Sequence, residues 1–130
     1  MTKDINNYKQ FRFRKFQIYK DARVLGIELK NLSKKFPKEE NFCLRSQLWR
    51  ALDSIVLNIA EGSDRGTDKD FAHFLNTSRT SLNEVIACLD LAYDNRYLTE
   101  NELNFYVNKC GNLANQLTAF RRKLLNEPTK

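Results

Sequence analysis

The sequence has few of the residues that tight turns, disulfide frameworks and metal sites require. Four Gly and two Pro among 130 residues argue against a β-sandwich or barrel, since those folds need many turns. Three widely spaced cysteines, Cys43, Cys88 and Cys110, cannot complete a disulfide framework and indicate a reducing compartment, so we expect a cytoplasmic protein. No apolar run approaches the roughly 20 residues of a membrane span, and no membrane partner is expected.

Catalytic and cofactor motifs are also missing. The chain has one His, which excludes most His-based catalysis and metal ligation, and a di-iron bundle would need two Glu-x-x-His pairs. The sequence offers only Asp70-Phe-Ala-His73, once and with the wrong acid. It contains no GxxxxGK[ST], GxGxxG or GxSxG motif. We therefore expect no enzyme activity, no catalytic residue, no metal and no cofactor.

Hydrophobic residues recur at spacings of three and four, which predicts an all-α protein. The first helix spans about 9–35 and the second about 39–61. The third opens at Thr67 and stops before the polar break at 94–96, and the fourth opens at Thr99 and continues to about Leu124. Similar lengths and short connections predict one up-down-up-down antiparallel four-helix bundle over residues 1–130, with ends that fray at about 1–8 and 126–130.

Local signals mark the ends of these helices. Phe36-Pro37 should end the first, because the residue before proline avoids the α region. Gly62 follows the last apolar residue of the second helix and is predicted to be its left-handed C′ residue. Thr67 and Thr99 each precede an acidic residue at capping-box spacing.

The positive charge is regional. Residues 1–35 hold ten Lys and Arg against three acids, a net of +7, whereas the whole chain carries +6. A polyanionic partner is therefore a reasonable hypothesis, with Phe16 as an aromatic for base stacking. The antiparallel bundle should bring the basic end of the fourth helix near the start of the first. The candidate nucleic-acid-binding residues are Arg12, Arg14, Lys15, Lys20, Arg23, Lys30, Lys34, Arg121, Arg122 and Lys123. The alternatives are an ordinary solvated face and, for residues 121–123, favourable charge at a helix C-terminus.

The second helix carries two further features. Trp49, Leu52 and Val56 lie beside its core stripe and would be partly wet in an isolated bundle, which favours a homo-oligomer interface. The alternative is a broad core that uses them. A polar stripe follows the same helix and predicts either a solvated face or a structural hydrogen-bond network with Arg79 or Glu84 of the third helix. The stripe consists of Gln47, Arg50, Ser54, Asn58 and Glu61, and we expect Asn58 and Glu61 to be partly buried.

The stretch from Phe36 to Leu91 resembles a known family. Phe36-Pro37-Lys38-Glu39-Glu40 is followed by Asn58-Ile59-Ala60-Glu61-Gly62 and then Phe74-Leu75. This pattern is similar to the proteins encoded in intervening sequences of bacterial 23S rRNA genes, and the resemblance covers roughly residues 13–125. It implies a left-handed antiparallel four-helix bundle that assembles as a ring, commonly a homopentamer. It also extends to accessory proteins of diversity-generating retroelements, which are basic pentamers that bind nucleic acid and a reverse transcriptase.

Two main functions remain open at this point, with an enzyme whose unrecognised site lies at subunit junctions as a weaker third. The first is a non-enzymatic oligomer that binds nucleic acid, with structured RNA favoured, mainly through charge and with little base readout. The second is a protein–protein adaptor ring, for example a partner of a reverse transcriptase.

Overall fold

A computed structural model describes residues 10–127. Within this range the chain forms four long helices: α1 (Gln17–Leu32), α2 (Leu44–Gly62), α3 (Asp68–Asp94) and α4 (Glu100–Leu125). Three short 3-10 turns accompany them: η2 (Arg12–Lys15), η3 (Ser33–Lys35) and η4 (Lys38–Glu40). The predicted frayed ends lie mostly outside the described residues.

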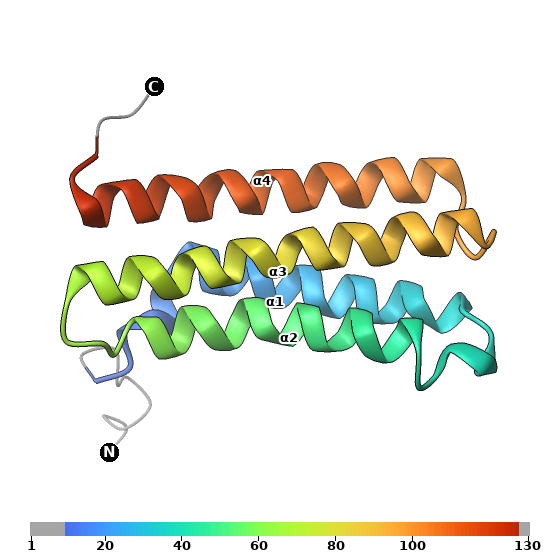
Figure 1. Cartoon of the computed structure of the whole chain (residues 1–130), viewed down its shortest axis with the longest axis horizontal. Helices are drawn as coiled ribbons and strands as arrows, with labels where there is room; N and C mark the ends of the chain where they lie inside the picture. Colours follow the sequence, from blue (N-terminus) through green and yellow to red (C-terminus); the bar gives the residue numbers. More distant parts are fainter. Residues whose placement is uncertain (1–9, 128–130) are drawn as a thin grey trace, which may run out of the picture.

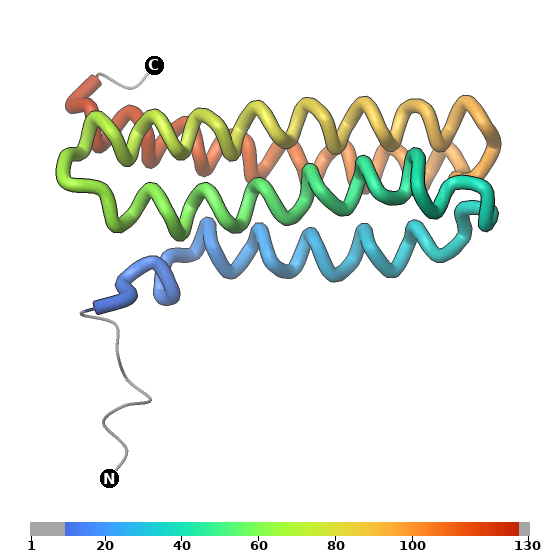
Figure 2. The backbone as a smooth tube through the Cα atoms, turned by 60° about the horizontal axis from the view of Figure 1, so that its bottom comes forward, coloured from blue at the N-terminus to red at the C-terminus, as the bar shows by residue number. Residues whose placement is uncertain are grey.

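The four helices run antiparallel to their neighbours in the chain (Figure 1). Each helix packs on the next, and α1 also contacts α4, which closes the bundle (Figure 2). The start of α1, the end of α2, the start of α3 and the end of α4 therefore share one end of the molecule. The predicted up-down four-helix bundle is confirmed.

A core of Leu and Ile side chains runs along the bundle axis. Leu29, Leu48, Ile59, Leu75 and Leu89 are fully buried and come from three helices, and α4 adds Cys110, Leu113 and Leu117. Burial of each large aliphatic side chain stabilises the fold by about 1.5–3 kcal/mol relative to exposure. The hydrophobic residues that recur at spacings of three and four in the sequence therefore include those that fill this core.

The first helix is shorter than the sequence predicted. Phe16 is extended, with φ −68° and ψ 133°, and separates η2 from α1. This break turns the Phe16 ring inward against Phe71 and Phe120, at centroid distances of 6.2 and 5.3 Å. Packing of the Phe16 ring into the core therefore interrupts the continuous helix that the hydrophobic spacing predicted. At the other end Phe36 is extended before Pro37, as predicted.

The second helix begins at Leu44 rather than near Glu39, since Lys38–Glu40 form a 3-10 turn and Cys43 has non-helical dihedrals. The prediction for Gly62 was wrong. It is the last residue of α2 and does not have a positive φ. A Cβ placed on Gly62 would lie 2.6 Å from the Phe74 Cβ, so the glycine allows close approach of α2 and α3.

Caps at the other helix ends follow the sequence closely. Thr67 Oγ1 accepts a hydrogen bond from the Asp70 amide at 3.1 Å. Thr99 and Glu102 form a complete capping box, with reciprocal bonds of 3.1 and 2.9 Å. Asn126 ends α4 in the left-handed region at φ 57°, a cap that the sequence analysis missed although Asn tolerates this conformation.

Candidate nucleic-acid interface

The basic side chains on the outer side of α1 face solvent, whereas its acidic side chains lie beside polar neighbours. Lys20, Arg23 and Lys34 are exposed on its outer side and in the turn that follows it. The two acids of α1 are each engaged by a polar neighbour. Asp21 accepts from Gln17 Nε2 at 2.9 Å, and Glu28 accepts from Lys109 Nζ of α4 at 2.8 Å. The outward field of α1 is therefore positive.

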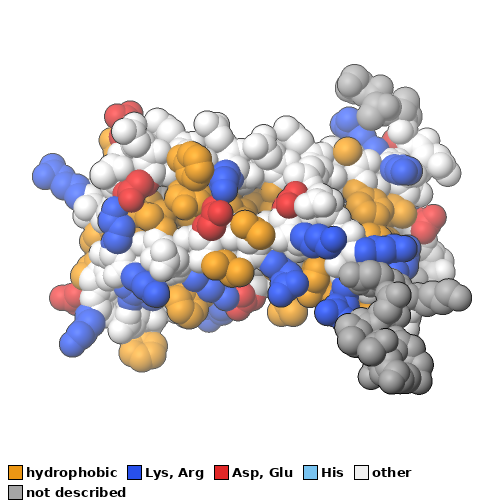
Figure 3. All heavy atoms as spheres, turned by 180° about the vertical axis from the view of Figure 1, so that it is seen from behind, with side chains coloured by type: hydrophobic (Ala, Val, Ile, Leu, Met, Phe, Trp, Pro, Cys, Tyr) orange, Lys and Arg blue, Asp and Glu red, His pale blue; other side chains and the backbone are white. Residues whose placement is uncertain are grey.

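Lys and Arg side chains extend along this side of the molecule, with hydrophobic side chains between them (Figure 3). Val24 and Ile27 are exposed on α1, and Ile27 is 68% exposed. Arg23 lies over the Tyr19 ring, with its Cζ 5.5 Å from the centroid. The face thus combines cations with apolar surface.

Two of the predicted binding residues have structural partners. The Arg12 guanidinium donates to the Ser63 carbonyl oxygen at 2.9 Å and lies 5.4 Å from the Phe71 centroid. Lys30 pairs with Asp53 at 2.6 Å and lies over the Trp49 ring at 5.2 Å. Arg12 therefore ties η2 to the end of α2, and Lys30 ties α1 to α2, so neither is available to phosphate without losing these contacts.

The end of α4 lies near the start of α1, as the antiparallel topology requires. Contact between the Phe16 and Phe120 rings places the two ends side by side. Arg122 is half-buried and Lys123 is exposed, while Arg121 Nη1 lies 4.0 Å from Glu127 Oε1. Arg14 and Lys15 are exposed in η2 at this end. These residues can contribute positive charge to one end of the bundle.

The hypothesis that Phe16 stacks on a base was wrong, because its ring belongs to the inner aromatic cluster with Phe71 and Phe120. Phe11, next to Arg12, is 42% exposed, and the most exposed aromatic rings lie elsewhere. Phe42 is 95% exposed before α2, and Phe105 is 53% exposed on α4. Periodicity did not single them out, since both lie off the core stripes.

The three predicted interface residues of α2 differ in their surroundings. Leu52 is 1% exposed and belongs to the core of the single chain, so the expectation that it would be partly solvent-exposed was wrong. Trp49 is partly exposed and donates from Nε1 to Ser33 Oγ at 2.9 Å, and Val56 is half-buried. With Ile27 and Leu57, Val56 lines a groove between α1 and α2 of about 390 Å³. The free apolar surface is therefore this groove, and Leu57 is the residue that sequence reasoning missed.

The polar stripe of α2 forms two separate groups of hydrogen bonds beside α3. Gln47 donates to Glu84, and Arg50 donates to Gln47 at 3.2 Å. Ser54 and Ser81 share a 2.9 Å hydrogen bond, and Asn58 donates to the Ser54 carbonyl at 2.8 Å.

Asn58 is half-buried, as expected, but Glu61 is exposed and the expectation of its burial was wrong. Arg79 is turned to the other side of α3 and donates to Thr118 Oγ1 of α4 at 3.1 Å. Glu61 lies on the side of α2 away from the buried Ile59 and Gly62, where it lines a surface depression with Phe11 and Arg65.

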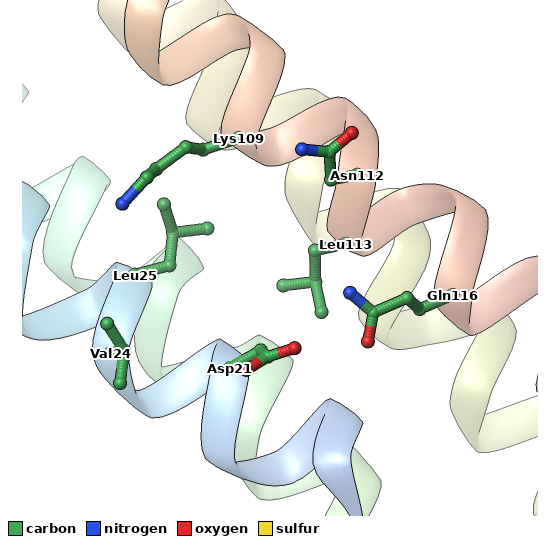
Figure 4. Close-up of a pocket in the computed structure, with 7 residues that line it drawn as sticks. All are labelled: Asp21, Val24, Leu25, Lys109, Asn112, Leu113 and Gln116. Atoms are coloured by element: carbon green, nitrogen blue, oxygen red, sulfur yellow. The ribbon is translucent and has the colours of Figure 1, made fainter.

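A cleft of about 220 Å³ separates α1 from α4 (Figure 4). Leu25 and Leu113 form its floor, Asp21 and Gln116 face each other across one end, and Lys109 extends toward α1 at the other. The hydrogen bond that Lys109 donates to Glu28 raises the pKa of Lys109, so this cation stays charged above the ordinary range.

Cys110 of α4 is a buried thiol. Burial raises the pKa of the Cys110 thiol to about 11, which opposes formation of the thiolate. Among residues 10–127, no three His, Cys, Asp or Glu side chains are grouped so as to hold a metal ion. In the same range, no helix has the length and apolar character of a membrane span.

An antiparallel four-helix bundle with a positive α1 face defines the class of this protein. The family of 23S rRNA-intervening sequence proteins matches residues 14–119, and the chain belongs to that family. Its fold is similar to the crystal structure of a protein with unknown function from the S23 ribosomal protein family of Bacteroides thetaiotaomicron. The TM-score is 0.73 at 22% identity, and the match covers 81% of this chain and 98% of the other. No curated protein matches the chain.

Proposed function

We propose that this protein is a non-enzymatic, oligomeric nucleic-acid-binding protein that acts on structured RNA. The observation that carries the proposal is the charge separation on α1. Its cations face outward, while Glu28 is paired with Lys109 and Asp21 accepts a hydrogen bond from Gln17 beside the cleft between α1 and α4. A polyanion that approaches this face meets positive charge with little opposing negative charge.

Binding would be mainly electrostatic. The exposed cations extend from Lys15 to Lys34, a sequence separation of 19, or about 28 Å if the segment were wholly helical. That length can meet several successive phosphates. In an oligomer the face is repeated, which strengthens binding through effective concentration without new contacts.

The groove between α1 and α2 supports self-association. Ile27 and Leu57 are 68% and 63% exposed and lie with Val56 around the same groove. A groove of exposed aliphatic side chains flanked by Arg23 and Lys30 suits burial against a second copy. The resemblance described above favours a ring, with a homopentamer as the expected size.

The adaptor function is the second candidate, and exposed apolar residues outside this groove favour it. Phe42 is almost fully exposed beside a shallow depression that includes Leu91 of α3. Such a surface suits a protein partner, and the resemblance suggests a reverse transcriptase as one example.

Salt-dependent RNA binding tests the leading proposal. Lys20 is exposed on the outer side of α1 and Lys34 in η3 directly after it, and the variant K20Q/K34Q removes two charges without touching the described ion pairs. The matched control is K38Q/K69Q, since Lys38 and Lys69 are exposed in other elements. Affinity for a labelled structured RNA is measured by fluorescence anisotropy over a range of salt concentrations.

The wild-type protein should lose affinity steeply with salt. If both lysines contact phosphate, K20Q/K34Q should flatten the slope of log affinity against log salt by about 1.4–1.8, at roughly 0.7 per contact for single strands and 0.9 for duplex DNA. The control should leave the slope nearly unchanged. Absence of binding at low salt, or equal slopes for both variants, would reject the α1 face and favour the adaptor function.

A further inference from the structure

The solvent side of α4 is free of charge over most of its length. Between residues 101 and 119 every exposed residue is uncharged, although 29% of the chain is charged. The exposed residues of this segment are Asn101, Asn104, Phe105, Asn108, Asn112, Asn115 and Ala119. We call the five asparagines among them the amide strip. From residue 101 to 119 the surface spans about 27 Å at 1.5 Å per residue.

Helix stability does not explain this composition. Asn is a poorer helix former than Ala, Lys or Glu, because its short amide competes for backbone hydrogen bonds. Exposed positions of a helix interior are ordinarily filled by those better formers. An amide strip that local propensity disfavours points to a surface that meets a polar ligand.

Cations border the amide strip. Lys109 lies beside it on α4 and extends toward α1 across the cleft that Figure 4 shows. Arg122 and Lys123 follow where the uncharged surface ends. Viewed from behind in Figure 3, α4 forms the upper part of the molecule, where the white surface of backbone and of side chains that are neither hydrophobic nor charged predominates.

We propose that the amide strip binds across the minor groove of an RNA helix. Each Asn side chain both donates and accepts hydrogen bonds, as a ribose 2′-hydroxyl does. The minor groove of A-form RNA is wide and shallow and displays 2′-hydroxyls and base edges, so a helix that carries amides fits it. Phosphates on the α1 side of the groove then lie near the exposed cations of α1, and phosphates beyond the end of the strip lie near Arg122 and Lys123. This inference rests on the proposed function and adds that RNA is recognised in preference to DNA.

A second copy of the chain is the less suitable occupant. A protein interface that covered the strip would have to satisfy every buried amide group, and its core would be expected to be more apolar. Only Phe105 and Ala119 supply exposed apolar surface there. The groove around Ile27 and Leu57, between α1 and α2, offers far more.

Comparison of RNA and DNA duplexes of the same sequence tests the inference. The variant N104A/N108A removes two neighbouring amides of the strip, and N76A/N83A removes two exposed asparagines of α3 as the control. Binding of both duplexes is measured for each protein, and light scattering and circular dichroism report assembly and folding. Both variants replace Asn by a better helix former, so the helices should remain intact.

The wild-type protein should bind the RNA duplex about tenfold more tightly than the DNA duplex, given the loss of about two hydrogen bonds on DNA. In N104A/N108A that ratio should fall close to one, with DNA affinity unchanged, and N76A/N83A should behave as wild type. An unchanged ratio in N104A/N108A, or a smaller assembly of that variant, would overturn the inference. Equal wild-type binding to both duplexes would overturn it and leave the proposed function standing, whereas binding to neither nucleic acid would reject both.

Discussion

Replacement of Gly62 by Ala tests the close approach of α2 and α3. The added Cβ would lie 2.6 Å from Phe74 Cβ and 3.0 Å from Phe71 Cδ1. The Phe74 Cβ is fixed to the backbone, so rotation of the side chain cannot relieve the clash and the helices must separate. Overpacking of this kind destabilises a fold by about 1–3 kcal/mol.

The helix propensity of Ala opposes this loss, by at most about 1 kcal/mol and less at the end of a helix. We therefore expect G62A to lower the free energy of unfolding by about 1–2 kcal/mol. Gly26 and Gly111 are matched controls, because a Cβ at either position meets nothing within 4 Å. In the absence of a partner on these surfaces, G26A and G111A should each stabilise the chain by about 0.5–1 kcal/mol.

Urea unfolding monitored by far-UV circular dichroism measures these differences. All four proteins are compared at one protomer concentration, since the stability of an oligomer depends on concentration. The expected order of stability places G62A below wild type and the two controls above it. If G62A is as stable as wild type, α2 and α3 do not approach each other as closely as described here.

Four further predictions follow from the contacts of single side chains. L57E should reduce the apparent mass in light scattering toward the 15.3 kDa monomer. The control L91E replaces an exposed Leu of α3 and should leave the mass unchanged. Equal masses for L57E and wild type would contradict assembly through the α1–α2 groove. N58A should lower the free energy of unfolding by about 1 kcal/mol, because it removes the hydrogen bond from Asn58 to Ser54. E61A should change the free energy of unfolding by less than about 0.5 kcal/mol, since Glu61 is exposed. A larger loss for E61A in denaturant melts would show that Glu61 has an unrecognised partner. The hydrogen bonds from Lys35 and Thr99 hold the pKa of Glu102 below its usual 4.5. The contribution of Glu102 to stability is therefore present above pH 4.5 and is lost as pH falls through the lower pKa of the folded protein. The difference in stability between wild type and E102Q should shrink over that range, and a constant difference would contradict the pairing. Iodoacetamide at neutral pH should alkylate the exposed Cys43 and spare the buried Cys88 and Cys110, so mass spectrometry of the native protein should find one adduct per chain and not three.

Most of the architecture was predictable because it depends on local signals. Stripes at spacings of three and four place Leu29, Leu48, Ile59 and Leu75 in one core. Thr99 and Glu102 specify a cap through residues only three apart, and Pro37 ends the first helical segment. Each of these features depends on neighbours in the sequence, so no tertiary information is needed.

The candidate interface was predictable only in part. Regional charge identified the α1 cations, but it could not separate those that face solvent from those with partners. Arg12 reaches the Ser63 carbonyl 51 residues away and Lys30 reaches Asp53, contacts that depend on how the helices pack. The uncharged face of α4 was overlooked, since each Asn is unremarkable until burial shows that all five are exposed along one side.

The sequence by itself determined the helices, their caps and the excess of positive charge, because hydrophobic period, capping chemistry and composition are properties of adjacent residues. Tertiary structure decided that Phe16 turns inward, that Leu52 is buried and that Glu61 is exposed. It also decided that Gly62 serves close helix packing and not a left-handed cap. These outcomes depend on which residues from distant parts of the chain fill the same space, and that is settled only when the four helices pack together.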